Sequence, residues 1–190
     1  MHRHAVRRLP APAKRHRGIT MLEVLIALTI LGLLLGIALP AVSGAVSRVR
    51  SVGARAAIST TLFDAQRDAT VLGQEVVICP GQGAGCQGGS DWSRGWLAFV
   101  DSNGDRQFGS DEPLVHREPA LPSGVRLIGT AGRTRLVYQP NGSNAGSNIS
   151  FTLCDRRGPT SAQSLVLANG GRLRHDRAPP ADAATCMAGL

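Results

Sequence analysis

One long apolar segment, from Ile19 to Leu39, constrains this chain more than any other feature. About 20 apolar residues are enough to cross the hydrocarbon core of a bilayer. Basic residues lie directly before the segment, so the positive-inside rule places the N-terminus in the cytoplasm and exports the C-terminal part. We therefore expect one inner-membrane-spanning helix over 19–39 and a periplasmic domain after it.

The net charge of the whole chain does not by itself indicate a nucleic-acid partner. The formal charge is +8 at pH 7, and 190 residues leave room for one small domain beyond the apolar segment. No acidic residue precedes Gly18, whereas six basic residues do: Arg3, Arg7, Arg8, Lys14, Arg15 and Arg17. Removal of this segment would lower the formal charge to +2.

The order of features at the N-terminus is wrong for an ordinary secretory signal. In such a signal the small-residue cleavage site follows the apolar core. Here Gly18 precedes the core, and Glu23 lies inside it. A carboxylate in an apolar membrane helix is costly and normally marks a functional site. The alternative is that Glu23 reaches the lipid headgroups.

The run from Arg17 to Ile26, with the sequence RGITMLEVLI, resembles the prepilin motif. The resemblance implies that prepilin peptidase cuts between Gly18 and Ile19 and that Ile19 is N-methylated. The usual first mature residue of this family is Phe, so Ile19 is a departure. The resemblance also implies that Glu23 pairs with the free N-terminal amine of a neighbouring filament subunit. Residues 1–18 would then be a leader peptide.

Export places four cysteines in an oxidising compartment, where an even number usually forms disulfides. They are Cys79, Cys86, Cys154 and Cys186. Three pairings are possible, and the cost of loop closure favours Cys79 with Cys86 and Cys154 with Cys186. Zinc is a weaker alternative because no C-x-x-C pair is present.

Beyond the apolar segment, the pattern predicts one helix and then many strands. Apolar residues recur at helical spacing up to Gly73, a plausible stop, so we expect an amphipathic continuation over 40–73. The stripe consists of Ile58, Leu62, Ala65, Ala69 and Leu72. Short β-type runs separated by turn residues follow, at 75–79, 96–100, 114–117, 125–128, 134–138, 150–154, 164–168 and 172–175. This order predicts an α+β fold, with an antiparallel sheet packed on the helix.

The same pattern sets the expected boundaries of the exported part. We expect a β-rich globular head over 74–177 and a C-terminal tail over 178–190 that begins with a Pro/Ala-rich stretch. The loops at 81–90 and 141–148, rich in Gly, Ser or Asn, are expected to be flexible.

The order of motifs in the head resembles the GspH/FimT family over nearly the whole mature chain. A VICP strand is followed by DWSRGW at 91–96, FVDSNGD at 99–105, FTLC at 151–154 and GRLR at 171–174. The resemblance implies a type IV pilin-like fold and a minor pilin or pseudopilin that assembles with other pilins. The cysteines and the last motif favour FimT/FimU-like minor pilins over GspH-like pseudopilins of type II secretion.

The GRLR motif comprises Gly171, Arg172, Leu173 and Arg174. In FimT proteins of naturally transformable bacteria this motif is associated with DNA binding, which implies a double-stranded DNA partner here. On a strand, the two arginines would share one face about 6.6 Å apart and could contact successive phosphates. Further candidates for this surface are Arg156, Arg157 and Arg177. The alternative is that an arginine pair protects an edge strand from aggregation.

The stretch from Asp101 to Asp105, with Glu112 further along, resembles the ligand spacing of a calcium loop. Arg106 stands where such a loop needs Gly, and an Asp/Asn/Gly turn explains the same residues. We therefore predict no metal site.

The sequence also offers no catalytic constellation. The glycine-rich stretch at 81–89 lacks the Lys-Ser/Thr ending of a phosphate loop. Trp92 and Trp96 are expected as core residues or loop anchors and not as ligand-stacking residues, because a small head needs their buried area. We expect neither enzyme activity nor a cofactor.

Overall fold

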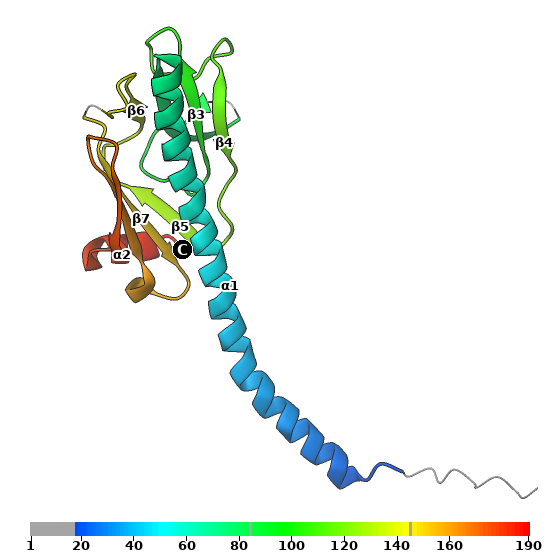
Figure 1. The fold of residues 1–190 in the computed structure, drawn as a ribbon. Helices are drawn as coiled ribbons and strands as arrows, with labels where there is room; N and C mark the ends of the chain where they lie inside the picture. Colours follow the sequence, from blue (N-terminus) through cyan, green and yellow to red (C-terminus); the bar gives the residue numbers. More distant parts are fainter. Residues whose placement is uncertain (1–17, 84, 145) are drawn as a thin grey trace, which may run out of the picture. The chain divides into compact units, whose positions relative to one another are not determined.

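The computed structural model describes residues 18–190 except Ala84 and Ala145. The expected leader peptide lies, apart from Gly18, outside the described residues. The chain divides into two compact units, Met1–Ala41 and Val42–Leu190 (Figure 1).

Helix α1, Met21–Leu72, begins with a side-chain cap and ends at a glycine. The hydroxyl of Thr20 accepts the Glu23 N–H at 3.2 Å, which satisfies one free donor of the first turn. At the other end, Gly73 adopts φ +66° and donates its N–H to the Ala69 carbonyl at 3.1 Å. This left-handed cap is the stop expected from the sequence.

The first half of α1 exposes its apolar side chains. Met21 is 82% exposed and Ile37 is 74% exposed. By length and composition, α1 contains one segment able to cross a membrane. Side chains as apolar and exposed as these, in the described part of the chain, need lipid or other helices to cover them.

The second half of α1 packs on the head through the expected stripe. Ala54, Ile58, Leu62, Ala65 and Ala69 are at most 3% exposed and belong to the main core. Leu72 differs from the expectation: it is 53% exposed, so the buried stripe ends at Ala69.

Two antiparallel sheets form the head, where the sequence predicted a single sheet. The first has the order β2-β1-β3-β4, with β6 also paired to β1. Its strands are β1 Glu75–Gln82, β2 Gly85–Cys86, β3 Trp96–Asp101, β4 Leu114–Glu118 and β6 Leu136–Tyr138. The second has the order β5-β7-β8-β9. Its strands are β5 Val125–Gly129, β7 Ile149–Asp155, β8 Gln163–Leu167 and β9 Leu173–Arg177, with a short 3-10 turn η1 at Pro159–Ser161.

The two tryptophans join the sheets to the helix, as expected of core residues. Both are fully buried. The indole of Trp96 donates to the Thr61 hydroxyl of α1 at 3.0 Å. Trp92 packs edge-on against Phe151, with ring centroids 5.1 Å apart.

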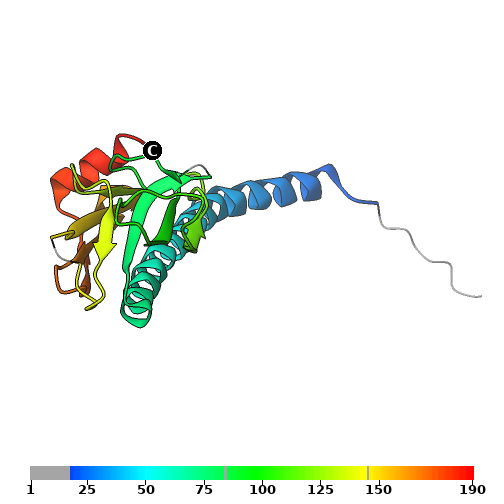
Figure 2. The same cartoon turned by 90° about the horizontal axis from the view of Figure 1, so that it is seen from above.

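The segment expected as a tail contains a helix, α2, Pro180–Met187. The disulfide Cys154–Cys186 fastens α2 to β7, and Cys79–Cys86 fastens β1 to β2. Both pairs are the ones that the sequence favoured. Side chains alternate across the second sheet, so Cys154 faces α2 while Leu153 and Leu165 face α1. Figure 2 shows this sheet between the two helices.

Candidate phosphate-binding surface

The GRLR motif forms the turn from β8 into β9. The Gly171 N–H donates to the Ala168 carbonyl at 2.9 Å, and the Ala168 N–H donates to the Arg172 carbonyl at 3.0 Å. Arg172 therefore lies in the turn, one residue before the strand, and Arg174 lies on β9 opposite Val166.

Gly171 fixes this turn to the C-terminal part of α1. It is buried and adopts φ +77°, a conformation that side chains disfavour. A Cβ atom there would overlap the side-chain amide of Gln66 and lie 3.1 Å from the Gly142 carbonyl oxygen. The Gln66 amide donates to that same carbonyl at 2.7 Å. The packing therefore requires glycine at this position. Because Gly171 holds the turn against α1, it also fixes the position of Arg172 on the surface of the head.

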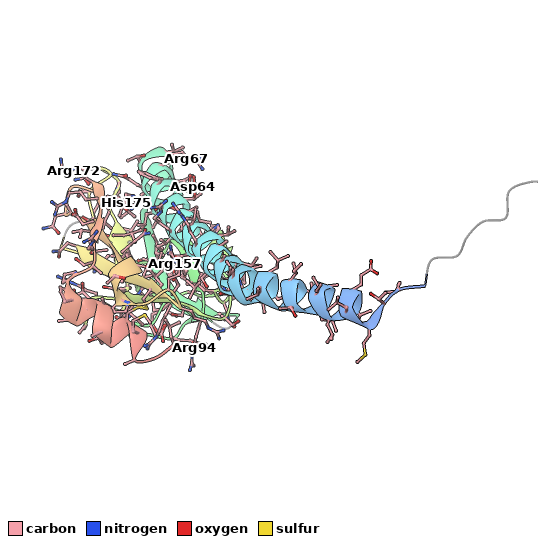
Figure 3. All side chains as sticks on the ribbon, turned by 90° about the horizontal axis from the view of Figure 1, so that it is seen from below. Asp64, Arg67, Arg94, Arg157, Arg172 and His175 are labelled. Atoms are coloured by element: carbon pink, nitrogen blue, oxygen red, sulfur yellow. A yellow bond between two sulfur atoms is a disulfide. The ribbon has the colours of Figure 1, made fainter. Side chains whose placement is uncertain are left out.

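Arg172 and Arg174 are exposed cations without an ion-pair partner among the described residues. Figure 3 shows Arg172 at the rim of the head. Strand alternation places Asp176 on the same face as Arg174, so this face of β9 carries one opposing charge. The pair is free to contact an anion.

Arg157 has a structural role. Its guanidinium donates to the Asp155 carboxylate at 2.9 Å and 2.6 Å, and its backbone N–H donates there at 2.9 Å. Burial by itself raises the pKa of Asp155, but the hydrogen bonds from Arg157 and Ser51 and the charge of Arg157 hold the pKa below its ordinary value. Figure 3 places Arg157 away from Arg172.

The remaining candidates, Arg156 and Arg177, do not join the pair either. Strands β7 and β9 run in the same direction, because both are antiparallel to β8. The residue after β7 and the last residue of β9 therefore lie at the opposite end of the sheet from Arg172. Alternation also turns Arg177 toward the α1 side, away from the face of Arg174.

Sequence reasoning missed a different cation near the motif, Arg133. Its guanidinium donates to the Asn148 side chain at 3.1 Å. Asn148 directly precedes β7, whose first residue pairs with Leu167, and Leu167 pairs with Leu173. Arg133 therefore lies at the same end of the second sheet as Arg172. Only strand pairing brings these distant positions together, so no local sequence signal could have found it.

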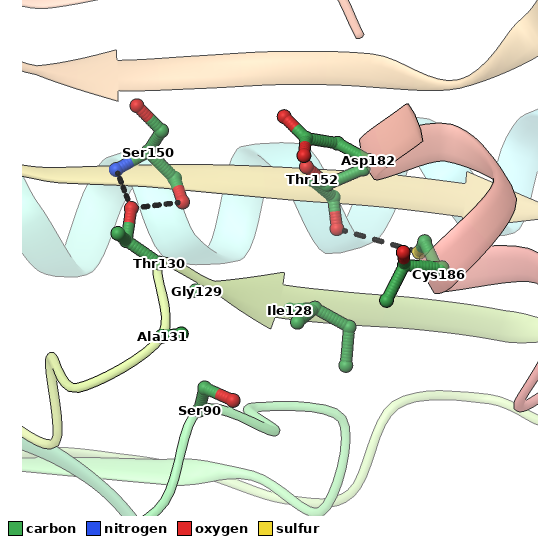
Figure 4. A pocket seen from close by; sticks show the side chains of 10 residues that line it. Ser90, Ile128, Gly129, Thr130, Ala131, Ser150, Thr152, Asp182 and Cys186 are labelled. Atoms are coloured by element: carbon green, nitrogen blue, oxygen red, sulfur yellow. Dashed lines mark hydrogen bonds between the residues drawn. The ribbon is translucent and has the colours of Figure 1, made fainter. Parts of the chain in front are cut away.

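A depression lies between β5, β7 and α2 (Figure 4). Thr130 accepts the Ser150 N–H at 3.0 Å, and the Cys186 sulfur lies 3.6 Å from the Thr152 carbonyl oxygen. Among its lining residues Asp182 is the sole charged one, and no histidine or lysine accompanies it. The lining offers no nucleophile with an adjacent base.

At the other end of the chain, Glu23 is exposed in the first turn of α1. Its backbone N–H is used by Thr20, but its carboxylate makes no hydrogen bond or ion pair with the described residues. The carboxylate is therefore available to a group from outside the chain.

Comparison with known proteins agrees with this architecture. Residues 54–171 match the family of the type II transport protein GspH, and residues 13–39 match the prokaryotic N-terminal methylation motif. The chain is similar to the pilin-like protein PilA1 of Thermus thermophilus, with 32% identity over 83% of this chain and 90% of that protein.

The fold is similar to a solved minor pilin. The crystal structure of the type IV minor pilin FimU of Pseudomonas aeruginosa gives a TM-score of 0.51 at 15% identity, covering 71% of this chain and 90% of that chain. A second crystal form of FimU gives 0.50 at 14% identity, with coverage of 70% and 94%.

The family that these sequence matches indicate has a structural and not an enzymatic role. The family match covers more than half of the chain, and the methylation motif precedes it. The protein belongs to the GspH family, as a minor type IV pilin or pseudopilin.

Proposed function

We propose that this protein is a minor subunit of a type IV pilus that also binds DNA through Arg172 and Arg174. The single observation that carries the DNA-binding part is the exposed, unpaired state of these two arginines, set on a turn that Gly171 locks against α1. Of the relatives, one is named a pilin-like protein and one a type IV minor pilin, which favours the pilus.

The N-terminal residues would serve assembly. Cleavage after Gly18 frees the amine of Ile19, whose N-methylation is supported by the matched motif. Glu23 would accept the amine of a neighbouring subunit, which explains a carboxylate that has no partner among the described residues. The exposed apolar surface from Ile19 to Leu39 would pack in the membrane first and in the filament core afterwards.

The position of the arginine pair suits a partner outside the filament. Gly171 packs on Gln66, whereas Gln163, at the other end of the second sheet, accepts a hydrogen bond from Arg55 at 3.2 Å. Eleven residues of helix separate these two contacts, about 16 Å at the usual rise. Arg172 therefore lies at the end of the head that is farther along α1 from the apolar segment.

The contacts would be made to phosphates and would not read sequence. Guanidinium groups at the rim of the head can pair with phosphate oxygens, and such contacts carry no sequence information. Arg133, at the same end of the sheet, would extend the surface beyond two charges. Binding of this kind weakens steeply with salt.

The test is fluorescence anisotropy of a labelled mixed-sequence duplex with the full-length protein in a non-ionic detergent. We expect salt-sensitive binding by the wild type and measurably weaker binding by Arg172→Gln/Arg174→Gln. The slope of log affinity against log salt should become shallower by about 1.8, since two phosphate contacts are removed.

The matched control is Arg156→Gln/Arg177→Gln, which removes the same charge from the other end of the sheet. Binding by this variant should stay close to wild type. An equal loss of DNA affinity in both variants would indicate a general effect of net charge. No binding of DNA by the wild type would exclude the DNA-binding role.

A second candidate function is a minor pseudopilin of type II secretion, which the description of the matched family favours. Such a subunit would assemble in the periplasm and would not meet DNA. Deletion of the gene discriminates the two: loss of surface pili indicates the first function, and loss of protein secretion with intact pili indicates the second.

A further inference from the structure

We propose that the loop between β3 and β4 binds a calcium ion through Asp101, Asp105 and Glu112. The site is separate from the arginine surface and does not depend on the proposed DNA binding. The sequence pattern alone favours a plain turn here, whereas the positions of the three carboxylates favour an ion.

The three carboxylates converge without a protein cation between them. One oxygen from each lies within 4.8 Å of the others. No ion pair among the described residues includes any of the three. The nearby guanidinium of Arg106 pairs instead with Glu75 at 3.2 Å. Three like charges at this separation repel one another unless a cation lies among them.

A second observation in favour of an ion, besides the clustering of the carboxylates, is the environment of the Glu112 side chain. It is 7% exposed, and its Oε2 atom accepts the Gly109 N–H at 2.9 Å. Its Oε1 atom is buried and has no hydrogen-bond partner. A buried carboxylate oxygen without a partner is costly, because it has lost its water and gained nothing in exchange. A metal ion within the cluster would supply the missing partner.

The loop also has the ligand spacing of a 12-residue calcium loop. That arrangement takes ligands from positions 1, 3, 5, 7, 9 and 12. With Asp101 at position 1, these are Asp101, Asn103, Asp105, Gln107, Gly109 and Glu112. Position 7 contributes its backbone carbonyl, and position 9 often acts through water, so Gln107 and Gly109 are compatible.

Arg106 stands at the position where a calcium loop normally has Gly, yet its backbone adopts the conformation that this position requires. Position 6 of such a loop is normally Gly, because the chain turns sharply there. Arg106 adopts φ 56°, and it is the only non-glycine residue with positive φ in the described part of the chain. The required conformation is therefore present without the glycine.

The carboxylates are held in place before any ion arrives. Asp101 accepts the N–H groups of Gly104 at 2.8 Å and Arg106 at 3.1 Å. Asp105 accepts the Gln107 N–H at 2.7 Å. Phe108 packs on Phe99 of β3, with ring centroids 5.4 Å apart, which anchors the middle of the loop.

The donor set selects the ion. All candidate ligands are oxygens, which suits calcium with its six to eight ligands and tolerance of irregular geometry. Magnesium demands near-ideal octahedral geometry, and zinc prefers nitrogen and sulfur. Extracellular calcium modules bind with dissociation constants on the order of 10⁻⁴ to 10⁻³ M, and we expect this range.

The test is thermal unfolding of the full-length protein in detergent, followed by the fluorescence of the two buried tryptophans. About 5 mM CaCl₂ should raise Tm by ~3 °C over a chelator, from ligand linkage at the expected affinity. The same concentration of MgCl₂ should raise Tm less. An unchanged Tm with calcium, or an equal rise with magnesium, would overturn the proposal.

Three variants locate the ion. Glu112→Gln keeps an acceptor for the Gly109 N–H but removes the charge, and it should lose the calcium-dependent shift. Asp105→Ala removes an exposed ligand, so it should fold and also lose the shift, even if the buried Glu112 variant does not fold. The control is Asp111→Ala, an exposed acid of the same loop outside the cluster. Loss of the calcium-dependent rise in Tm in Asp111→Ala would contradict binding at this site. Retention of that rise in Asp105→Ala would contradict it as well.

Discussion

At the scale of single residues, Gly171 links packing to the proposed function. Its backbone conformation and its contact with Gln66 both require the absence of a side chain. The side chains of Arg172 and Arg174 make no hydrogen bond or ion pair with the described residues, so they contribute little to stability and are free to serve binding. The motif thus combines a glycine needed for folding with arginines needed for contact.

We predict that Gly171→Ala lowers the free energy of unfolding by about 2 kcal/mol, because Ala must adopt a left-handed conformation and displace Gln66. Gly170→Ala is the matched control, since it has no positive φ and no atom within 4 Å of its added Cβ. Thermal unfolding of both variants measures the difference. Equal Tm values for the two variants would refute the packing role of Gly171.

Asp155 gives a prediction on pH. Because its pKa in the folded state lies below the ordinary value, the carboxylate contributes stability above about pH 4, where the unfolded chain is also ionised. That contribution is lost as the pH falls through the folded-state pKa. Asp155→Asn should cost about 2 kcal/mol at pH 7, because Arg157 loses its charged partner. The difference in the free energy of unfolding between wild type and Asp155→Asn should be smaller at pH 3 than at pH 7. A difference that does not change with pH would contradict a lowered pKa of Asp155 in the folded state.

Among the helices and strands, the sequence predicted the features that depend on neighbouring residues. It did not predict the features that depend on which strands pair. The stripe from Ile58 to Ala69 and the β-type runs follow from periodicity, and the structure has a strand at each of those runs. The division into two sheets depends on which strands pair, which no local pattern encodes. The same reason explains why Arg133 was missed and why Arg156 and Arg177 were grouped with Arg172. Helix α2 was read as a tail because two prolines open it, although Pro is favourable in a first helical turn.

The two disulfides should differ in their contribution to stability. Cys154–Cys186 closes a separation of 32 residues and holds α2 on β7, whereas Cys79–Cys86 closes 7. The loop-entropy relation gives about 4 kcal/mol for the longer loop and about 2.5 kcal/mol for the shorter one. Double Cys→Ser variants of each pair, compared by thermal unfolding, should show the larger loss of Tm for Cys154/Cys186. The reverse order would exclude loop closure as the main effect.

In the whole molecule, a folded head follows a helix whose first half exposes its apolar side chains. Lipid can cover that apolar surface before assembly, and other subunits can cover it afterwards. The unpartnered carboxylate of Glu23 fits the same sequence of events, because its proposed partner exists only after cleavage frees an amine. We therefore expect the same N-terminal segment to act in three successive steps, which are membrane insertion, cleavage of the leader and assembly into the filament.

The intact mass of the protein recovered from sheared surface filaments tests most directly whether the chain is a processed filament subunit. We predict a chain that begins at N-methylated Ile19, with Gly18→Leu protein absent from the filaments and retained uncut in the membrane. A wild-type chain that keeps residues 1–18, or normal processing of the Gly18 variant, would contradict the account of this protein as a processed filament subunit.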